Sequence, residues 1–232
     1  MIEYLDTLDR SLLLAMNGSE SLFLDGVMKV ITTTWIWIPM FVVLFYVLFK
    51  NNSLKSFFIT LVAIALTILV CDQVASGICK PLFHRFRPTQ DPHIMYLVDV
   101  VDGYRGGRFG FISSHAANTF GIAVFLSLLF RKSFFTIIIT CWAILSSYSR
   151  IYLGVHYPGD ILCGCLVGLL TGWLMFLLYV RVLRSAGGNR GQQWASGLYT
   201  STGYLVSDIR LLVVTLLLTY ALIPAIGVWI VG

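Results

Sequence analysis

Two of the four histidines lie where a polar segment runs into an apolar one. His115 follows the polar stretch of residues 80–114, and His156 precedes the apolar stretch of residues 159–180. An ionisable side chain at such a boundary is costly unless it faces water or a partner, so its placement indicates a functional site. Either histidine alone could equally be a hydrogen-bonded interfacial residue. The pair indicates acid–base or nucleophilic chemistry.

The residues after His156 predict how its ring is held. Pro158 suits the first position of a helix, which makes Asp160 the third residue, and a side chain there can reach back to the preceding turn. A carboxylate at one imidazole nitrogen fixes the tautomer and leaves the lone pair of the other nitrogen pointing outward. We therefore predict that Asp160 orients His156 as a nucleophile.

His115 is predicted to begin a helix that Ser113 or Ser114 caps. The free backbone N–H groups at that helix end provide a site for an anion. A histidine that gains a proton when an anion arrives can donate that proton to a departing alkoxide. This places His115 as the candidate acid.

Three cations accompany the histidines: Lys80, Arg87 and Arg150. Phosphoryl transfer develops charge on the equatorial oxygens, and Arg forks with a Lys point charge can compensate it. No ligand spacing for a divalent cation is evident among the loop carboxylates Asp91, Asp99 and Asp102. We expect metal-independent catalysis without a cofactor.

These residues form three motifs: Lys80-x6-Arg87-Pro88, Ser113-Ser114-His115, and Ser149-Arg150-x5-His156-x3-Asp160. In order and spacing they resemble the signature motifs of the type 2 phosphatidic acid phosphatase (PAP2) family, which includes glucose-6-phosphatases and vanadium haloperoxidases. The resemblance spans residues 80–160. It implies a phosphohistidine at His156, Asp160 as its orienter, His115 as acid and then base, and phosphate ligands at Lys80, Arg87, Ser113 and Arg150.

The second motif departs from the family's usual Pro-Ser-Gly-His. Ile112 replaces the proline and Ser114 replaces the glycine. A serine N–H can still bind phosphate unless the backbone there requires a positive φ. Ser114 is therefore retained as a candidate phosphate ligand.

The composition indicates a membrane protein. Hydrophobic residues make up 58% of the 232 residues and charged residues 12%, about half the charged share of soluble proteins. Six apolar stretches approach the roughly 20-residue length of a spanning helix: 27–49, 56–79, 114–130, 134–152, 159–180 and 211–231. We expect one all-α domain over residues 1–232, a polytopic bundle of about six transmembrane helices.

The N-terminal segment, residues 1–23, is expected to form a helix lying in the membrane interface. Leu5, Leu8, Leu12 and Met16 recur at helical spacing opposite charged residues. An ordinary surface helix fits the same pattern. The segment lacks the apolar core of a cleavable signal peptide.

The distribution of basic residues predicts the topology. The connections 50–55, 131–132 and 181–210 share one side of the membrane and hold eight Lys or Arg, which makes that side cytoplasmic. Residues 80–113 and 149–160 then meet on the opposite face. The formal net charge of +5 is explained by these connections and anionic headgroups, so no nucleic-acid partner is expected.

The remaining basic residues, the glycines and the cysteines have mainly structural interpretations. Part of the basic cluster Lys80, Arg85, Arg87, Arg105 and Arg108 is expected to bind phosphate. Gly164, Gly168 and Gly172 recur every four residues, which favours close packing against a neighbouring helix, with dimerisation as the alternative. The five cysteines lack metal-ligand or disulfide spacing and are expected to be packing residues.

The sequence thus predicts a phosphatase for lipid phosphates or diphosphates in the bacterial cytoplasmic membrane, acting at the periplasmic or exterior face. Candidate substrates are undecaprenyl diphosphate first, then phosphatidylglycerol phosphate, lipid A phosphate and phosphatidate, with membrane lipids as the surroundings. A transporter or scaffold is the alternative, although no charged group lies mid-helix. The spanning segments argue against a soluble haloperoxidase. The sequence does not predict an oligomeric state.

Overall fold

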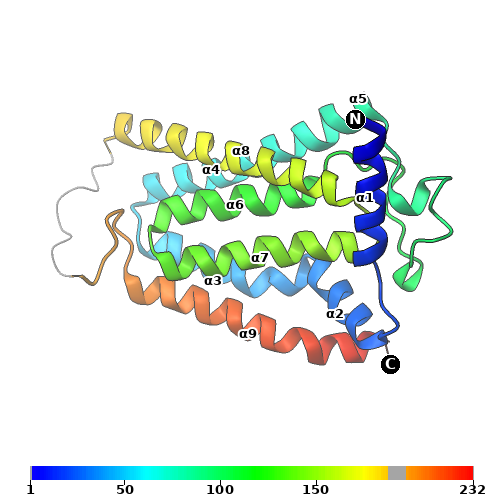
Figure 1. Cartoon of the computed structure of the whole chain (residues 1–232). Helices are drawn as coiled ribbons and strands as arrows, with labels where there is room; N and C mark the ends of the chain where they lie inside the picture. Colours follow the sequence, from blue (N-terminus) through cyan, green and yellow to red (C-terminus); the bar gives the residue numbers. More distant parts are fainter. Residues whose placement is uncertain (1, 188–196, 232) are drawn as a thin grey trace.

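The computed structural model describes residues 2–187 and 197–231, which are almost entirely helical. The long helices run side by side along one axis (Figure 1). They are α3 (Ile38–Lys50), α4 (Leu54–Asp72), α6 (Ser114–Phe130), α7 (Ser133–Tyr152), α8 (Pro158–Ser185) and α9 (Val206–Val231), whereas the short α2 (Leu22–Thr32) is bent away from α3. No β-strand occurs in the described ranges, where strand-like pairing is limited to two isolated bridges. The expected all-α membrane bundle is confirmed.

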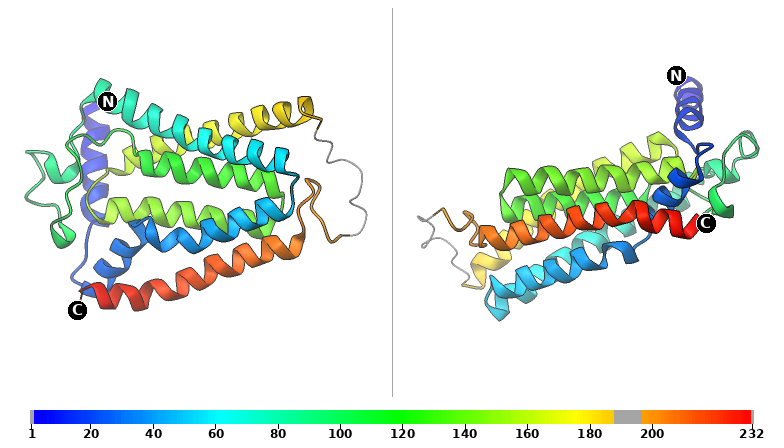
Figure 2. Two further views of the ribbon diagram at one scale, coloured as in Figure 1. Left: turned by 180° about the vertical axis from the view of Figure 1, so that it is seen from behind. Right: turned by 90° about the horizontal axis from the view of Figure 1, so that it is seen from below.

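Helix α1 (Ile2–Met16) crosses one end of this bundle instead of joining it (Figures 1 and 2). Leu5, Leu8 and Leu12 are exposed, as expected for an interfacial helix, whereas Leu13 is fully buried and Met16 packs partly against the same cluster. Met16 therefore does not share the exposed face that its spacing predicted. The helix also ends before residue 23, because the chain turns at Gly18 with a φ of +62°.

Four helical segments are long and apolar enough to cross a membrane. They are Leu54–Phe83, Ser133–Tyr152, Pro158–Ser185 and Val206–Trp229. The pair Leu22–Thr32 and Trp35–Lys50 also qualifies if it counts as one span, although it is bent by 67°. Helix α6, with 17 residues, is shorter. The described residues thus give four to five candidate spans, and the expected count of six is not confirmed.

The bend explains why the expected span 27–49 is not one helix. Thr33 Oγ1 donates to the carbonyl of Val30 at 2.6 Å, and the Trp37 indole N–H donates to the carbonyl of Ile31 at 3.0 Å. The Thr33 backbone N–H also donates to the Val30 carbonyl, at 3.0 Å, so these donors satisfy carbonyls at the end of α2 that the helix itself leaves open. The short 3-10 helix η1 (Trp35–Trp37) then leads into α3.

The expected span 56–79 instead continues beyond its predicted end. A π-helical turn, η2 (Gln73–Cys79), joins α4 directly to α5 (Lys80–Phe83). Lys80 therefore lies on a helix, whereas the sequence prediction had placed it at the start of the loop. The loop that follows contains the short 3-10 helices η3 (Pro88–Gln90) and η4 (Val101–Gly103).

The backbones of helices α6 and α8 approach each other closely. A Cβ added at Gly164, Gly168 or Gly172 would lie 2.4–2.5 Å from a carbonyl oxygen of α6 or its N-cap. The prediction of close helix packing is confirmed. Because α6 covers this stripe, it is not available to a second copy.

The connections gather at the two ends of the bundle. Residues 51–53 and 131–132 lie at one end, together with the connection after α8, of which residues 188–196 lie outside the described residues (Figures 1 and 2). The loop 84–113 and the turn 153–157 lie at the other end. They touch directly, since the Thr89 N–H donates to the Gly154 carbonyl at 3.3 Å. The expected meeting of these two segments is confirmed.

Candidate active site

His156 occupies the turn between α7 and α8 and is almost fully buried, with 2% of its surface exposed. Its Nε2 atom lies 3.3 Å from Nη1 of Arg87. Because a guanidinium can only donate, Nε2 must accept, which places the ring proton on Nδ1. Burial lowers the pKa of His156 to about 4, with Asp160 opposing the shift and Arg87 adding to it. At neutral pH the ring is therefore uncharged, with its lone pair on Nε2.

Asp160 lies on the other side of the ring and is fully buried. Its Oδ2 atom accepts the Tyr157 N–H at 3.0 Å and lies 3.5 Å from His156 Nδ1. The reach back from the third helix position is therefore present. At 3.5 Å the contact with the ring is longer than a standard hydrogen bond, and Nδ1 has no hydrogen-bond partner among the described residues.

His115 is the second residue of α6 and lies close enough to His156 and Arg150 for electrostatic interaction. Ser113 caps the helix, since its Oγ atom accepts the Ala116 N–H at 3.3 Å. Ser114 lies within the helix and is absent from the positive-φ residues. The replacement of glycine by Ser114 is therefore compatible with this backbone.

Arg87 contacts His156, Arg150 interacts electrostatically with both histidines, and Lys80 contacts Ser114, the residue before His115; all three lack a carboxylate partner. Lys80 donates to the hydroxyls of Ser76 at 2.9 Å and Ser114 at 3.2 Å. Among the described residues none of the three cations forms a salt bridge. Arg87 and Arg150 are nevertheless 9% and 8% exposed. Buried unpaired cations are costly, so this arrangement fits an anion better than an empty site.

The positive charge of Arg87 has no carboxylate partner among the described residues. Burial lowers its pKa, and the nearby cation of Arg150 lowers it further. Its guanidinium donates to the carbonyls of Phe109 and Val155, both at 3.2 Å, which aims Nη1 at His156. The second arginine, Arg150, donates to Thr32 Oγ1 at 2.6 Å and to the Tyr104 hydroxyl at 3.0 Å.

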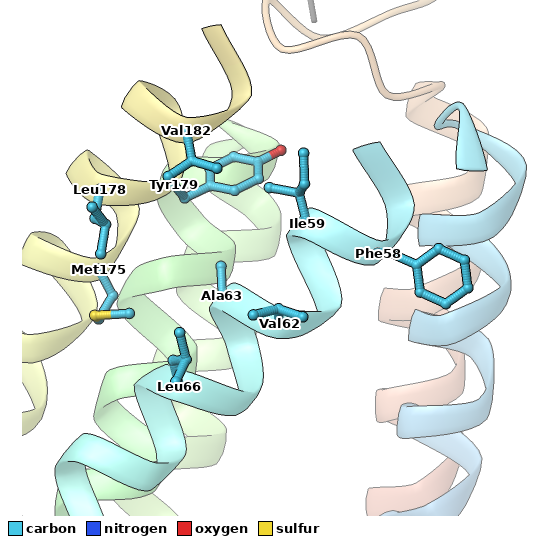
Figure 3. A pocket seen from close by; sticks show the side chains of 9 residues that line it. All are labelled: Phe58, Ile59, Val62, Ala63, Leu66, Met175, Leu178, Tyr179 and Val182. Carbon is cyan, nitrogen blue, oxygen red and sulfur yellow. The ribbon is translucent and has the colours of Figure 1, made fainter. Parts of the chain in front are cut away.

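A cleft of about 560 Å³ reaches this site from the side of α2. Arg150 lines it together with Tyr104, Lys29 and Asp102, and the last two form an ion pair across it. A separate groove of about 260 Å³ between α4 and α8 is almost wholly apolar and includes none of the predicted site residues (Figure 3). Of these two cavities, the α2 cleft is the one that a predicted site residue, Arg150, lines.

The remaining cations of the loop have other partners. Arg85 pairs with Asp160 at 2.9 Å, Arg105 donates to the Thr89 carbonyl at 3.0 Å, and Arg108 packs over the rings of Phe86 and Phe109. Of the basic cluster, Lys80 and Arg87 therefore stay available to phosphate. No group of three or more His, Cys, Asp or Glu that could hold a metal ion occurs in the part of the chain that the structure describes.

Sequence reasoning missed three residues that touch this set. Arg85 was named only as a member of a basic cluster of which part was expected to bind phosphate, and its contact with the Asp160 carboxylate was not predicted. Thr32 and Tyr104 received no role, although both bind Arg150. Their positions relative to Arg150 depend on tertiary packing, so no motif or spacing could have indicated them.

Comparison with known proteins agrees with this geometry. Residues 56–184 match the PAP2 superfamily. The chain is 46% identical over 179 residues to a protein of Bacteroides thetaiotaomicron named lipid A 4'-phosphatase, covering 77% of this chain and 80% of that one. It is 39% identical to a Porphyromonas gingivalis protein of the same name, covering 77% and 76%. It is 29% identical to an undecaprenyl-diphosphatase of Sulfolobus acidocaldarius, covering 70% and 72%.

A solved structure shares the fold. The transmembrane PAP2 type phosphatidylglycerolphosphate phosphatase from Bacillus subtilis superimposes with a TM-score of 0.57 at 22% identity, covering 77% of this chain and 88% of that one. The expected resemblance to the PAP2 family is confirmed, and with it an enzyme instead of a transporter or scaffold. The chain belongs to the PAP2 superfamily and is a membrane-embedded phosphatase of that family.

Proposed function

We propose that the protein hydrolyses a lipid phosphate or diphosphate through a phosphohistidine at His156. The observation that carries this proposal is the set of three cations without carboxylate partners around an uncharged His156. A phosphate placed there would supply the missing negative charge next to the lone pair of Nε2. The same geometry would serve no purpose in a purely structural site.

The reaction proceeds in two steps. Nε2 of His156 attacks phosphorus, the bond from phosphorus to the leaving oxygen breaks, and His115 donates a proton to that oxygen. Water then attacks the phosphohistidine while His115 takes its proton, and inorganic phosphate leaves. Asp160 stabilises the charge that develops on the His156 ring.

The three cations replace a metal ion in this scheme. Lys80, Arg87 and Arg150 compensate the charge on the equatorial oxygens, and the N–H groups at the start of α6, from Ser114 onward, add hydrogen bonds. The Ser113 backbone N–H donates to the Asp160 carbonyl at 3.1 Å, so Ser113 would reach phosphate only through its hydroxyl, whose oxygen also caps α6. We therefore propose metal-independent catalysis.

Among the candidate lipids we favour a phosphate monoester on a lipid A-type glycolipid. The relatives named lipid A 4'-phosphatase are 46% and 39% identical to the chain, compared with 29% for the relative named undecaprenyl-diphosphatase. This reverses the order that the sequence had suggested, in which undecaprenyl diphosphate came first. We place the site at the non-cytoplasmic face of a bacterial cytoplasmic membrane, because the basic connections lie at the opposite end.

Phosphate release by the purified protein tests the proposal. The protein in detergent is incubated with lipid A bisphosphate, undecaprenyl diphosphate or phosphatidylglycerol phosphate in excess EDTA, with His156→Ala as the control. We expect release to be fastest from lipid A, and mass spectrometry identifies which phosphate is lost. Absence of release from every lipid, or equal release by His156→Ala, contradicts the proposed function. Strict dependence on Mg²⁺ contradicts the metal-independent mechanism.

A further inference from the structure

A second charged cluster lies on the far side of Asp160 from His156. Its centre is Arg85, which contacts Asp160 Oδ1 at 2.9 Å, Asp9 Oδ2 at 2.8 Å and Asp6 Oδ1 at 3.4 Å. The guanidinium also lies over the Tyr157 ring, 4.0 Å from its centroid. Two of these carboxylates belong to α1, the helix that crosses the end of the bundle.

Asp9 also connects α1 directly to the first turn of α8. Its Oδ1 atom accepts the Gly159 N–H at 2.7 Å, while its Oδ2 atom holds Arg85. The N–H groups in the first turn of a helix lack partners within the helix, and a carboxylate there is favoured by the helix dipole. Asp9 thus binds both the residue before Asp160 and the arginine that holds Asp160.

The position of the Asp160 carboxylate depends on these contacts. Oδ1 has Arg85 as its hydrogen-bond donor, while Oδ2 accepts the Tyr157 N–H and faces His156 Nδ1. Without Arg85, a fully buried carboxylate oxygen would lose its partner, and the group would rotate or shift to find another. Because a catalytic side chain must be held within about 0.5 Å and 10–20° of its productive geometry, such a shift would reach His156.

A further link from α1 reaches the residue next to His156. The Tyr157 hydroxyl donates to Asp91 Oδ2 at 2.8 Å, and Arg10 lies 3.3 Å from the same oxygen. Residues 156–160 are therefore held by α1 both at Gly159 and through Asp91. Among the described residues Asp6, Asp9 and Asp91 form ion pairs with Arg10 and Arg85 only, so these carboxylates do not compete with phosphate for Lys80, Arg87 or Arg150.

We propose that Asp9 and Arg85 are positioning residues for the phosphatase reaction, acting through Asp160 to hold the His156 ring. This rests on the proposed function, in which His156 is the nucleophile. Helix α1 is then part of the active site, although none of its residues contacts the reacting atoms. A purely structural role would tie the helix down without affecting the state of His156.

The first arm of the test is kinetic. Asp9→Asn and Arg85→Gln should each lower kcat for phosphate release about tenfold, the lower end of the loss when an outer partner of a histidine is removed. KM should stay within about twofold, and Arg85→Lys should recover part of the rate. The double variant should lose no more than the worse single one, since both act on one group. Glu3→Gln and Arg184→Gln are the matched charge-loss controls, and both should keep the wild-type rate.

The second arm does not depend on activity. Nitrogen NMR of the protein with ¹⁵N-labelled histidine, assigned with His156→Ala, reports which ring nitrogen carries the proton. We expect Nδ1–H alone in the wild type and a mixture of tautomers in Asp9→Asn and Arg85→Gln. Inactivity of the wild type toward every lipid would overturn the proposed function, and the NMR arm would still decide the positioning role.

Three results would overturn the positioning proposal. The first is an unchanged His156 tautomer in both variants. The second is a loss that falls on KM alone, and the third is a double variant whose loss equals the product of the single losses. Thermal unfolding in detergent accompanies each variant. A variant that does not fold is replaced by Arg85→Lys or Asp9→Glu, which keep the charge and alter the geometry.

Discussion

At the scale of single residues, the two histidines differ in what each can do. The Nε2 atom of His156 faces Arg87, and the Nδ1 atom faces Asp160. His115 lies at the start of α6, close enough to Arg150 for electrostatic interaction. A nucleophile is needed for every substrate. An acid is needed only in proportion to the basicity of the leaving oxygen.

The leaving group should therefore separate the two roles. His156→Ala should lower single-turnover phosphoryl transfer by roughly a thousandfold or more with any substrate. His115→Ala should lose about 10²–10⁴-fold with a lipid phosphate, and much less with p-nitrophenyl phosphate, whose leaving group needs no proton. Burst measurements are required because the proposed mechanism also uses His115 to activate water in the second step. Equal losses with both substrates for both variants would refute the assignment.

The acid side of the pH profile should report His156. Because its folded-state pKa is lowered to about 4, mainly by burial, the nucleophile stays uncharged from neutral pH down to about pH 5. Removing Arg87 removes a cation that lowers this pKa, so the acid limb of kcat/KM should move to higher pH in Arg87→Gln. The ratio of variant to wild-type kcat/KM cancels the titration of the substrate. A limb that stays in place or moves to lower pH would show that the Arg87 cation does not lower the pKa of His156.

The sequence predicted much of the site at this scale, because the motif residues are adjacent to helix starts whose geometry is local. Asp160 reaches back from the third position of α8 for that reason. The role of Arg85 was not predicted because two of its partners, Asp6 and Asp9, belong to a helix far away in the sequence. The Lys80-x6-Arg87-Pro88 motif selected Arg87 as a phosphate ligand, but nothing in that spacing indicated that Arg85 would hold a carboxylate.

At the scale of helices, the α6–α8 contact fixes the distance between two parts of the site. Helix α6 carries Ser113 and His115, and α8 carries Asp160. Gly164, Gly168 and Gly172 let the two backbones approach, so their spacing is set by the absence of side chains.

Gly168→Ala should therefore destabilise the protein, although alanine is the better helix former by about 1 kcal/mol. Its Cβ atom would lie 2.4 Å from the Ala117 carbonyl oxygen, and a backbone atom cannot move aside by changing rotamer. We expect a cost of about 1–3 kcal/mol, typical of overpacking, seen as earlier thermal unfolding in detergent. Leu170→Ala, at an exposed position of the same helix, is the control. A Gly168→Ala variant that is more stable than the wild type would show that α6 and α8 can move apart without cost, and would contradict this prediction.

Helix lengths were less predictable than helix positions. Hydropathy located the apolar stretches, but the break between α2 and α3 depends on Thr33 and Trp37 donating to backbone carbonyls. The continuation through η2 to Phe83 depends on a π-helical turn, which leaves no hydropathy signal. Both are side-chain or backbone arrangements that the apolar pattern does not contain.

At the scale of the whole molecule, the two ends of the bundle differ in chemistry. One end carries the loop 84–113, the turn 153–157 and α1, and the other end carries the basic connections (Figure 1). The positive-inside bias therefore predicts the face on which lipid phosphate is hydrolysed.

Cysteine labelling in intact cells tests this orientation. In a background without the five native cysteines, Gly107→Cys should react with an impermeant maleimide, because a Cβ there meets nothing within 4 Å and the φ is not positive. Gly103, in the same loop, is a poorer choice because its φ is +67°. Ser185→Cys, exposed at the opposite end, should react only after lysis. The reverse pattern would invert the topology.

The position of α1 also sets an order of events during synthesis. Asp9 leaves the ribosome before any of its partners exist, since Arg85 follows far behind and Gly159 is later still. At about 5–20 residues per second, residue 159 follows residue 9 by roughly 8–30 s. Through that interval the first helix must wait at the membrane surface while the bundle inserts behind it. Complete docking of α1 therefore cannot precede the synthesis of α8, and an enzyme whose α1 has not docked would be inserted but slow.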